Sequence, residues 1–116
     1  MHWHQLSDLS QINHIKKLSE QSDIRAVLIF KHSTRCNISD MALSRMQYNF
    51  PDDPKIPCYY LDLLKHRDVS QTLVKEFGIE HQSPQILLIK NGKCIYHNSH
   101  SGIMVPDILE ILETTK

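Results

Sequence analysis

The chain has 116 residues, of which 41% are hydrophobic, and its equal numbers of basic and acidic side chains give no net charge at neutral pH. This size and composition predict one domain over residues 1–116 with a modest core, and the balanced charge offers no basic surface for nucleic acid or for a membrane. No apolar run is long enough to span a bilayer and the N-terminus lacks the pattern of a signal peptide, so we expect a cytoplasmic protein.

Helical and strand-like patterns alternate along the first half of the chain. Apolar residues at every third position predict a helix from Ser7 to about Gln21. The continuous apolar block from Arg25 to Lys31 predicts a strand that is covered on both faces, and helical spacing returns from Asn37 to about Tyr48. Prolines and aspartates at 51–54 break the chain, and another strand is predicted from Pro57 to Leu63.

The second half adds a hairpin and two helices. A short helix around residues 69–77 is followed by Gly78 as its predicted C-cap. The strand 85–90 is followed by Asn91-Gly92, a strong signal for a tight hairpin, so residues 93–98 are expected to pair back as an antiparallel edge strand. A last helix follows Pro106. This order predicts an α/β fold with a four-stranded mixed sheet, helices on both faces and a terminal β-hairpin.

Cys36 is the candidate nucleophile because it lies where a buried strand ends and the next predicted helix begins. A thiol reacts as the thiolate, and a helix N-terminus favours an anion through its free N–H groups and its dipole. Arg35 adds a positive charge beside it, and His32 is a second residue able to bias the charge of the thiol. We assign the flanking residues Thr34 and Asn37 to substrate binding.

Ser39 occupies the position at which a C-x-x-C motif has its second thiol. A serine cannot attack a mixed disulfide, so release from Cys36 requires a separate thiol. We expect Ser39 to donate a hydrogen bond to the thiolate or to satisfy the first turn of the helix. The other cysteines, Cys58 and Cys94, lie on predicted strands and are assigned to packing, and an odd count without an export signal argues against a disulfide scaffold.

Several segments together resemble the thioredoxin fold: Cys36 after a buried strand, Phe77-Gly78-Ile79, Ser83-Pro84, residues 87–93, and Ser101-Gly102 before the last helix. The resemblance implies that Pro84 is a cis-proline beside the nucleophilic cysteine and that the backbone of Ser83 pairs with an extended substrate. This chain departs from thioredoxin in having Arg35 where that family has tryptophan. It also has no carboxylate on the strand before the site, where thioredoxin uses a buried aspartate to deprotonate its resolving thiol.

A narrower resemblance rests on Ser33 to Ser39 followed by Met41-Ala42, which is similar to the YtxJ-like, monothiol bacilliredoxin-type proteins. Their usual motif is Thr-Cys-Pro-Ile-Ser; here Arg35 stands between Thr34 and Cys36, and Asn37 replaces the proline. The resemblance implies reduction of mixed disulfides between client proteins and a low-molecular-weight thiol, with bacillithiol as co-substrate, no bound cofactor and a frequent link to stress responses.

Two other functions are consistent with the residues alone. One is a thioredoxin-fold binding or sensor module without turnover, in which Cys36 reports oxidation as a sulfenic acid. The other is metal binding by some of the eight histidines, although their spacings match no established ligand pattern, and we assign no metal ligand. Polar residues on the predicted edge strand 93–98 blunt that edge, which favours a monomer.

Overall fold

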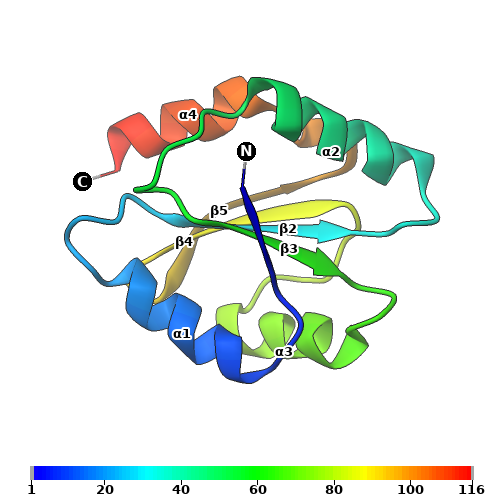
Figure 1. The fold of residues 1–116 in the computed structure, drawn as a ribbon, viewed down its shortest axis with the longest axis horizontal. Coiled ribbons are helices and arrows are strands. Elements are labelled where there is room, and N and C mark those ends of the chain that lie inside the picture. The colour runs from blue at the N-terminus through cyan, green and yellow to red at the C-terminus, as the bar shows by residue number, and fades with distance from the viewer. Residues whose placement is uncertain (1, 116) are drawn as a thin grey trace.

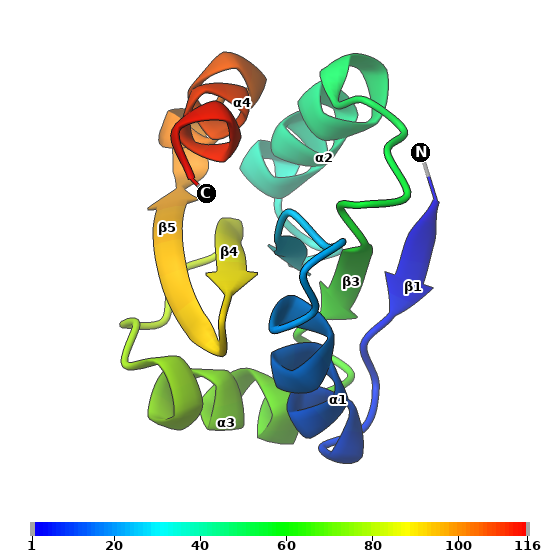
Figure 2. The same cartoon turned by 90° about the vertical axis from the view of Figure 1, so that its left-hand side faces the viewer.

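A mixed β-sheet forms the centre of the computed structural model, which describes residues 2–115. Within them the sheet has five strands in the order β1-β3-β2-β4-β5: β1 (Trp3–Gln5), β2 (Val27–His32), β3 (Cys58–Asp62), β4 (Gln85–Lys90) and β5 (Lys93–Ser99). Helices α1 (Ser10–Ser19) and α3 (Arg67–Phe77) cover one face, and α2 (Asn37–Asn49) and α4 (Val105–Thr114) cover the other (Figures 1 and 2). A short 3₁₀ turn, η1 (His100–Gly102), connects β5 to α4.

The central strand β2 is buried along its whole length, as its continuous apolar sequence predicts. Successive side chains of a strand point to opposite faces. Leu28 and Phe30 therefore join the hydrophobic cluster beneath α2 and α4, whereas Val27 and Ile29 join the cluster against α1 and α3. The strand is thus shared by both halves of the core, which explains why it shows no polar alternation.

Strand directions bring two segments that are distant in sequence to one end of the central strands. β2 is parallel to β3, whereas β4 runs antiparallel to β2 with Lys31 opposite Gln85. The last residues of β2 therefore lie beside the first residues of β4. The turn that follows His32 and the Ser83-Pro84 segment that precedes β4 consequently meet at the same end of these strands, which we call the site edge.

Local turn chemistry is confirmed at two glycines. Asn91 and Gly92 have φ values of 54° and 75°, and two positive φ angles in a two-residue loop are typical of the type I′ turn that suits a hairpin. Gly78 ends α3 with φ 68°, and its N–H donates to the carbonyl of Val74 over 2.9 Å. None of the helices in residues 2–115 has the length and hydropathy needed to cross a membrane.

The predicted four-stranded sheet is wrong by one strand, because β1 pairs in parallel with β3 at the edge. β1 has three residues, too few for a periodic pattern. It is held by Trp3, whose ring lies 5.9 Å from that of Phe30 and 6.1 Å from that of Tyr60, measured between ring centroids. The first helix is also shorter than predicted: Gln11 turns its side-chain oxygen back to accept the N–H groups of Ser7 and Asp8, which keeps both outside it.

Candidate active site

Cys36 is the N-cap of α2, at the site edge. The chain leaves β2 at His32, and the Cys36 N–H donates to the carbonyl of Ser33 over 3.2 Å, which closes the turn. Cys36 itself is extended, with φ −119° and ψ 120°, and its carbonyl accepts the N–H of Asp40 over 3.0 Å as the first helical bond. The partly exposed thiol therefore lies where free helical N–H groups favour an anion.

Ser39 is fully buried beneath this turn and belongs to a polar chain. Its oxygen accepts the Ser33 N–H over 3.0 Å and lies 2.7 Å from Nδ1 of His32. On the other side of the ring, Nε2 of His32 lies 3.5 Å from a carboxylate oxygen of Asp40. A carboxylate favours a proton on the nitrogen that faces it, so Nε2 carries the proton and the Ser39 hydroxyl donates to Nδ1.

The imidazole ring of His32 is neutral in this group of hydrogen-bonded side chains. It is buried, and burial lowers its pKa below the ordinary value, although the carboxylates of Asp40 and Asp62 act in the opposite direction. The Ser39 hydroxyl is thus directed to His32; a hydrogen bond to the thiolate was one of the two roles expected for it from the sequence, and within residues 2–115 its partners are the Ser33 N–H and His32. Sequence reasoning found His32 only as a neighbour of Cys36; its bond to Ser39 had no sequence signal.

The Ser83–Pro84 peptide bond is cis. Pro84 is buried directly before β4, and its carbonyl accepts the His100 N–H over 3.0 Å, which ties this segment to η1. The side-chain oxygen of Ser83 is buried and has no hydrogen-bond partner among the described residues. Both residues lie at the site edge, directly before β4, the strand that pairs with the one leading to Cys36.

The remaining predicted site residues surround the thiol in sequence and are exposed: Thr34, Arg35 and Asn37. No ion pair within residues 2–115 includes Arg35. The strand before the site has no carboxylate, and its penultimate residue is a buried lysine. Lys31 donates to the side-chain oxygen of Gln85 over 2.9 Å, and burial lowers the pKa of Lys31 to about 8.

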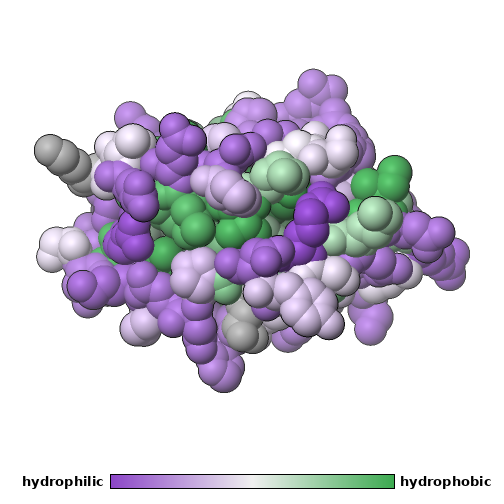
Figure 3. All heavy atoms as spheres, turned by 90° about the horizontal axis from the view of Figure 1, so that it is seen from above, coloured by the Kyte–Doolittle hydropathy of each residue, from purple (hydrophilic) through white to green (hydrophobic). Residues whose placement is uncertain are grey.

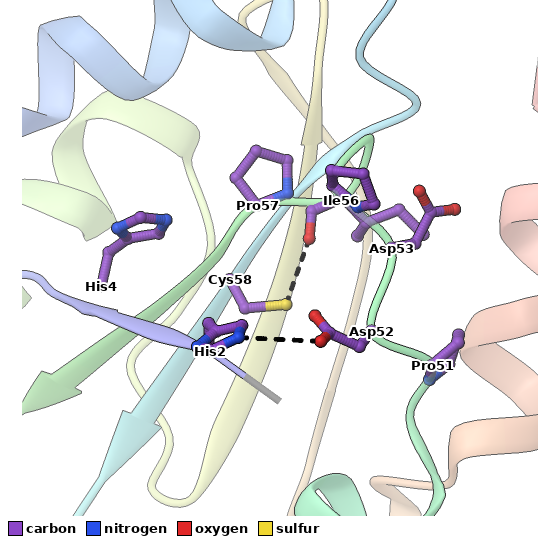
Figure 4. A pocket seen from close by; sticks show the side chains of 9 residues that line it. His2, His4, Pro51, Asp52, Asp53, Ile56, Pro57 and Cys58 are labelled. Carbon is purple, nitrogen blue, oxygen red and sulfur yellow. Dashed lines mark hydrogen bonds and ion pairs between the residues drawn. The ribbon is translucent and has the colours of Figure 1, made fainter.

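The other two cysteines lie away from this site. Cys58 begins β3, at the opposite end of the sheet, in a pocket of about 490 Å³ that also contains His2 and Asp52 (Figure 4). Its thiol donates to the carbonyl of Ile56, and burial raises the pKa of Cys58 to about 12. Cys94 packs against the cluster beneath α1 and α3, and burial raises its pKa too. Neither thiol is placed to resolve a disulfide at Cys36.

No group of three or more histidine, cysteine, aspartate or glutamate side chains within residues 2–115 is arranged to hold a metal ion. At the pocket around Cys58, one histidine lies near one carboxylate: Nε2 of His2 is 3.8 Å from a carboxylate oxygen of Asp52 (Figure 4). Both side chains are mostly exposed, and such a pair contributes little to stability.

Solved structures with the same fold are thioredoxin-like. One, described as a proposed oxidoreductase with a thioredoxin fold, is 26% identical and has a TM-score of 0.77, with 92% of this chain and 90% of that chain covered. The thioredoxin of Malassezia sympodialis is 18% identical, with a TM-score of 0.70 and coverage of 98% and 90%. The thioredoxin of Trypanosoma brucei brucei is 15% identical, with a TM-score of 0.70 and coverage of 97% and 92%. Fold and thiol site together define a thioredoxin-like thiol oxidoreductase.

The family can be stated more closely. The model of the monothiol bacilliredoxin BrxC family matches residues 7–108, which include every element from α1 to β5 and the whole site edge. The chain belongs to this family.

Proposed function

We propose that the protein is a monothiol disulfide reductase that removes a low-molecular-weight thiol, bacillithiol, from S-thiolated client proteins through Cys36. The observation that carries the proposal is the pairing of a partly exposed cysteine at the start of α2 with a serine three residues later whose hydroxyl is bonded to His32. Membership of the bacilliredoxin family supports bacillithiol as the small thiol.

The reaction consists of two thiol–disulfide exchanges. The Cys36 thiolate attacks the small-thiol sulfur of the client's mixed disulfide; the client thiolate leaves and takes a proton from water. Cys36 now forms a disulfide with the small thiol. The thiolate of a second small thiol attacks the small-thiol sulfur of that disulfide, which releases the symmetric small-molecule disulfide and restores the Cys36 thiolate. Each step breaks one S–S bond and forms another.

The neighbouring residues have distinct proposed roles. The first turn of α2 and the cation of Arg35 favour the thiolate. Ser39 is a positioning residue: bonded to the N–H of Ser33 and to His32, it fixes the turn that presents the thiol. Substrate contact is assigned to two exposed residues that flank Cys36, Thr34 and Asn37, and to the Ser83-Pro84 segment across the site edge.

Intact-mass analysis tests the proposal. The wild type and the variants Cys36→Ser and Cys94→Ser are incubated with bacillithiol disulfide and, separately, with glutathione disulfide. We expect a single adduct with bacillithiol disulfide, absent in Cys36→Ser and retained in the matched Cys94→Ser control. Reduction of a bacillithiolated protein by catalytic amounts of wild type, with free bacillithiol present, then tests turnover.

Two results would contradict the proposal. If neither disulfide modified Cys36, the module would be one that binds or senses without exchange. If glutathione disulfide reacted and bacillithiol disulfide did not, the choice of bacillithiol would be wrong and the exchange chemistry would stand.

A further inference from the structure

A second concave feature lies along the first turns of α2, the helix that begins at Cys36. It is a pocket of about 220 Å³ between the first turns of α2 and the η1 turn, lined by Ile38, Met41, Arg45, His100 and Ser101. Ile38 follows Cys36, the N-cap of α2, by two residues, so one wall of the pocket belongs to the helical turn that follows the thiol. A larger pocket, of about 450 Å³ between α2 and α4, shares Arg45 with it. Figure 3 looks onto this face and shows hydrophobic side chains along its middle, flanked by hydrophilic ones.

Arg45 is the fixed positive charge of this pocket. Its Nε donates to the carbonyl of Ile103 over 3.1 Å and its Nη2 to the carbonyl of His100 over 3.3 Å, which orients the guanidinium against η1. These partners are neutral and use two of its five N–H groups. No carboxylate in residues 2–115 forms an ion pair with Arg45, nor with Arg35 on the other side of Cys36.

We propose that this pocket binds the carboxylate-bearing part of the low-molecular-weight disulfide that reacts at Cys36. The inference rests on the proposed function and adds which group of the small thiol is recognised and where that group binds. An arginine with free N–H groups is suited to a carboxylate, which it can bind in a bidentate manner. The volume of about 220 Å³ is below the roughly 300–1,000 Å³ of pockets that enclose a drug-sized ligand, and fits one part of a small molecule.

The apolar wall completes the match. Ile38 is 51% exposed and Met41 is 62% exposed, although both are apolar. They lie three residues apart, on one face of α2, with Arg45 one further turn along. The carboxylate-bearing part of the small thiol would place its aliphatic carbons on this wall and its charge at Arg45. Its sulfur would remain at the Cys36 end, where the S–S bond to Cys36 forms and the other half of the disulfide leaves as a thiolate.

The test compares three small symmetric disulfides of similar size: 3,3′-dithiodipropionate, which is anionic; 2-hydroxyethyl disulfide, which is neutral; and cystamine, which is cationic. Second-order rates of adduct formation at Cys36 are measured by intact mass at low ionic strength. The informative quantity is the ratio of the anionic rate to the neutral rate. We expect Arg45→Gln to lower this ratio about tenfold, the effect of losing one hydrogen-bonded charge pair, and high salt to reduce it in the wild type.

Three further variants separate binding from folding. Arg45→Lys keeps the charge and should recover most of the ratio. Met41→Glu places a negative charge in the pocket without removing the carbonyl contacts of Arg45, and should lower the ratio while raising the cystamine rate. Arg25→Gln removes an equal charge at the far end of β2, where Arg25 pairs with Asp53, and should leave the ratio at its wild-type value.

Each other outcome overturns the proposal in a distinguishable way. If the ratio stays constant in both Arg45→Gln and Met41→Glu while the adduct still forms at Cys36, the pocket is not the carboxylate site and the proposed function stands. If these variants instead slow only the reduction of an S-thiolated protein, the pocket serves the client polypeptide. If no disulfide reacts at wild-type Cys36, the proposed function and the inference both fail.

Discussion

Lys31 is a buried cation, and replacing it tests the electrostatics next to the site. Its side chain is 1% exposed at the end of β2, and its only hydrogen bond within the described residues is donated to Gln85. Burial lowers its pKa to about 8, so at pH 7 the folded protein holds a desolvated ammonium group. We expect Lys31→Met, which keeps the length and apolar stem of the side chain, to increase stability at pH 7.

The size of the effect follows from the pKa. One pH unit of difference between the folded and unfolded pKa corresponds to about 1.4 kcal/mol, so a fall from 10.5 to about 8 means a cost of about 3 kcal/mol for the charged form. The variant also loses the hydrogen bond to Gln85, worth about 1 kcal/mol. The expected net gain is therefore about 2 kcal/mol, within the range seen when buried charges are replaced by apolar residues.

The sign of the pH dependence is also fixed. Below pH 8 both the folded and the unfolded wild type hold the Lys31 proton, so the full cost is present. Between pH 8 and 10.5 the unfolded chain binds more protons than the folded one, and wild-type stability gains with rising pH. The advantage of Lys31→Met should therefore shrink strongly by pH 10.

Urea denaturation of both proteins at pH 7 and pH 10, under reducing conditions, measures this difference, because titrations common to both proteins cancel in it. Lys17→Met on the exposed side of α1 is the matched control and should change stability by less than about 0.5 kcal/mol. The reasoning is refuted if Lys31→Met destabilises at pH 7, or if its advantage is the same at pH 10.

Three further predictions concern the site and the thiols. Ser39→Ala should lower the free energy of unfolding by about 1–3 kcal/mol in urea denaturation, because the Ser33 N–H and the His32 ring lose a buried partner. In proton NMR, His32 should titrate below the ordinary histidine value of 6.5, and the stability that its neutral form contributes should be complete above pH 6.5 and lost as the pH falls further. Iodoacetamide at pH 8 should label Cys36 in the native protein but not Cys58, whose pKa is about 12; peptide mass spectrometry reads the sites.

Each of these predictions has a control. Ser44→Ala, at an exposed position of α2, separates loss of the buried hydroxyl from the general effect of alanine in that helix; equal stabilities of the two variants would argue against the role of Ser39. A His32 signal that titrates at or above pH 6.5 would contradict the effect of its burial. Urea-unfolded protein should be labelled at both cysteines, and equal labelling in the native state would contradict the raised pKa of Cys58.

The features that could be predicted from the sequence are those with a local cause. The hairpin follows from Asn91-Gly92 and the end of α3 from Gly78, because both depend on φ angles that few residues adopt. The location of Cys36 between a strand and a helix follows from the change of hydrophobic period on either side of it. β1 had no such signal, because its pairing with β3 and the packing of Trp3 both involve residues far away in sequence.

The polar contacts beneath the site could not be predicted for the same reason. The bond from Ser39 to His32 depends on the angle at which α2 leaves the end of β2, and Lys31 meets Gln85 only because β4 pairs in this register. At the sequence level Lys31 is merely the polar end of an apolar run. The neighbours of Lys31 are therefore set by strand pairing, and the partner of the Ser39 hydroxyl by the path of the chain from β2 into α2.

The strand order separates early from late events in folding. β4 and β5 are joined by two residues, and such hairpins close in about 1–10 μs. β1, by contrast, must wait until β3 is in place, since Trp3 pairs with Cys58 across half of the chain. We expect β1 to be the last strand to dock and the first to detach. The chain has a single tryptophan, Trp3. Its fluorescence therefore reports the detachment of β1 from β3 in real time, without an attached label and without chemical modification of Cys36.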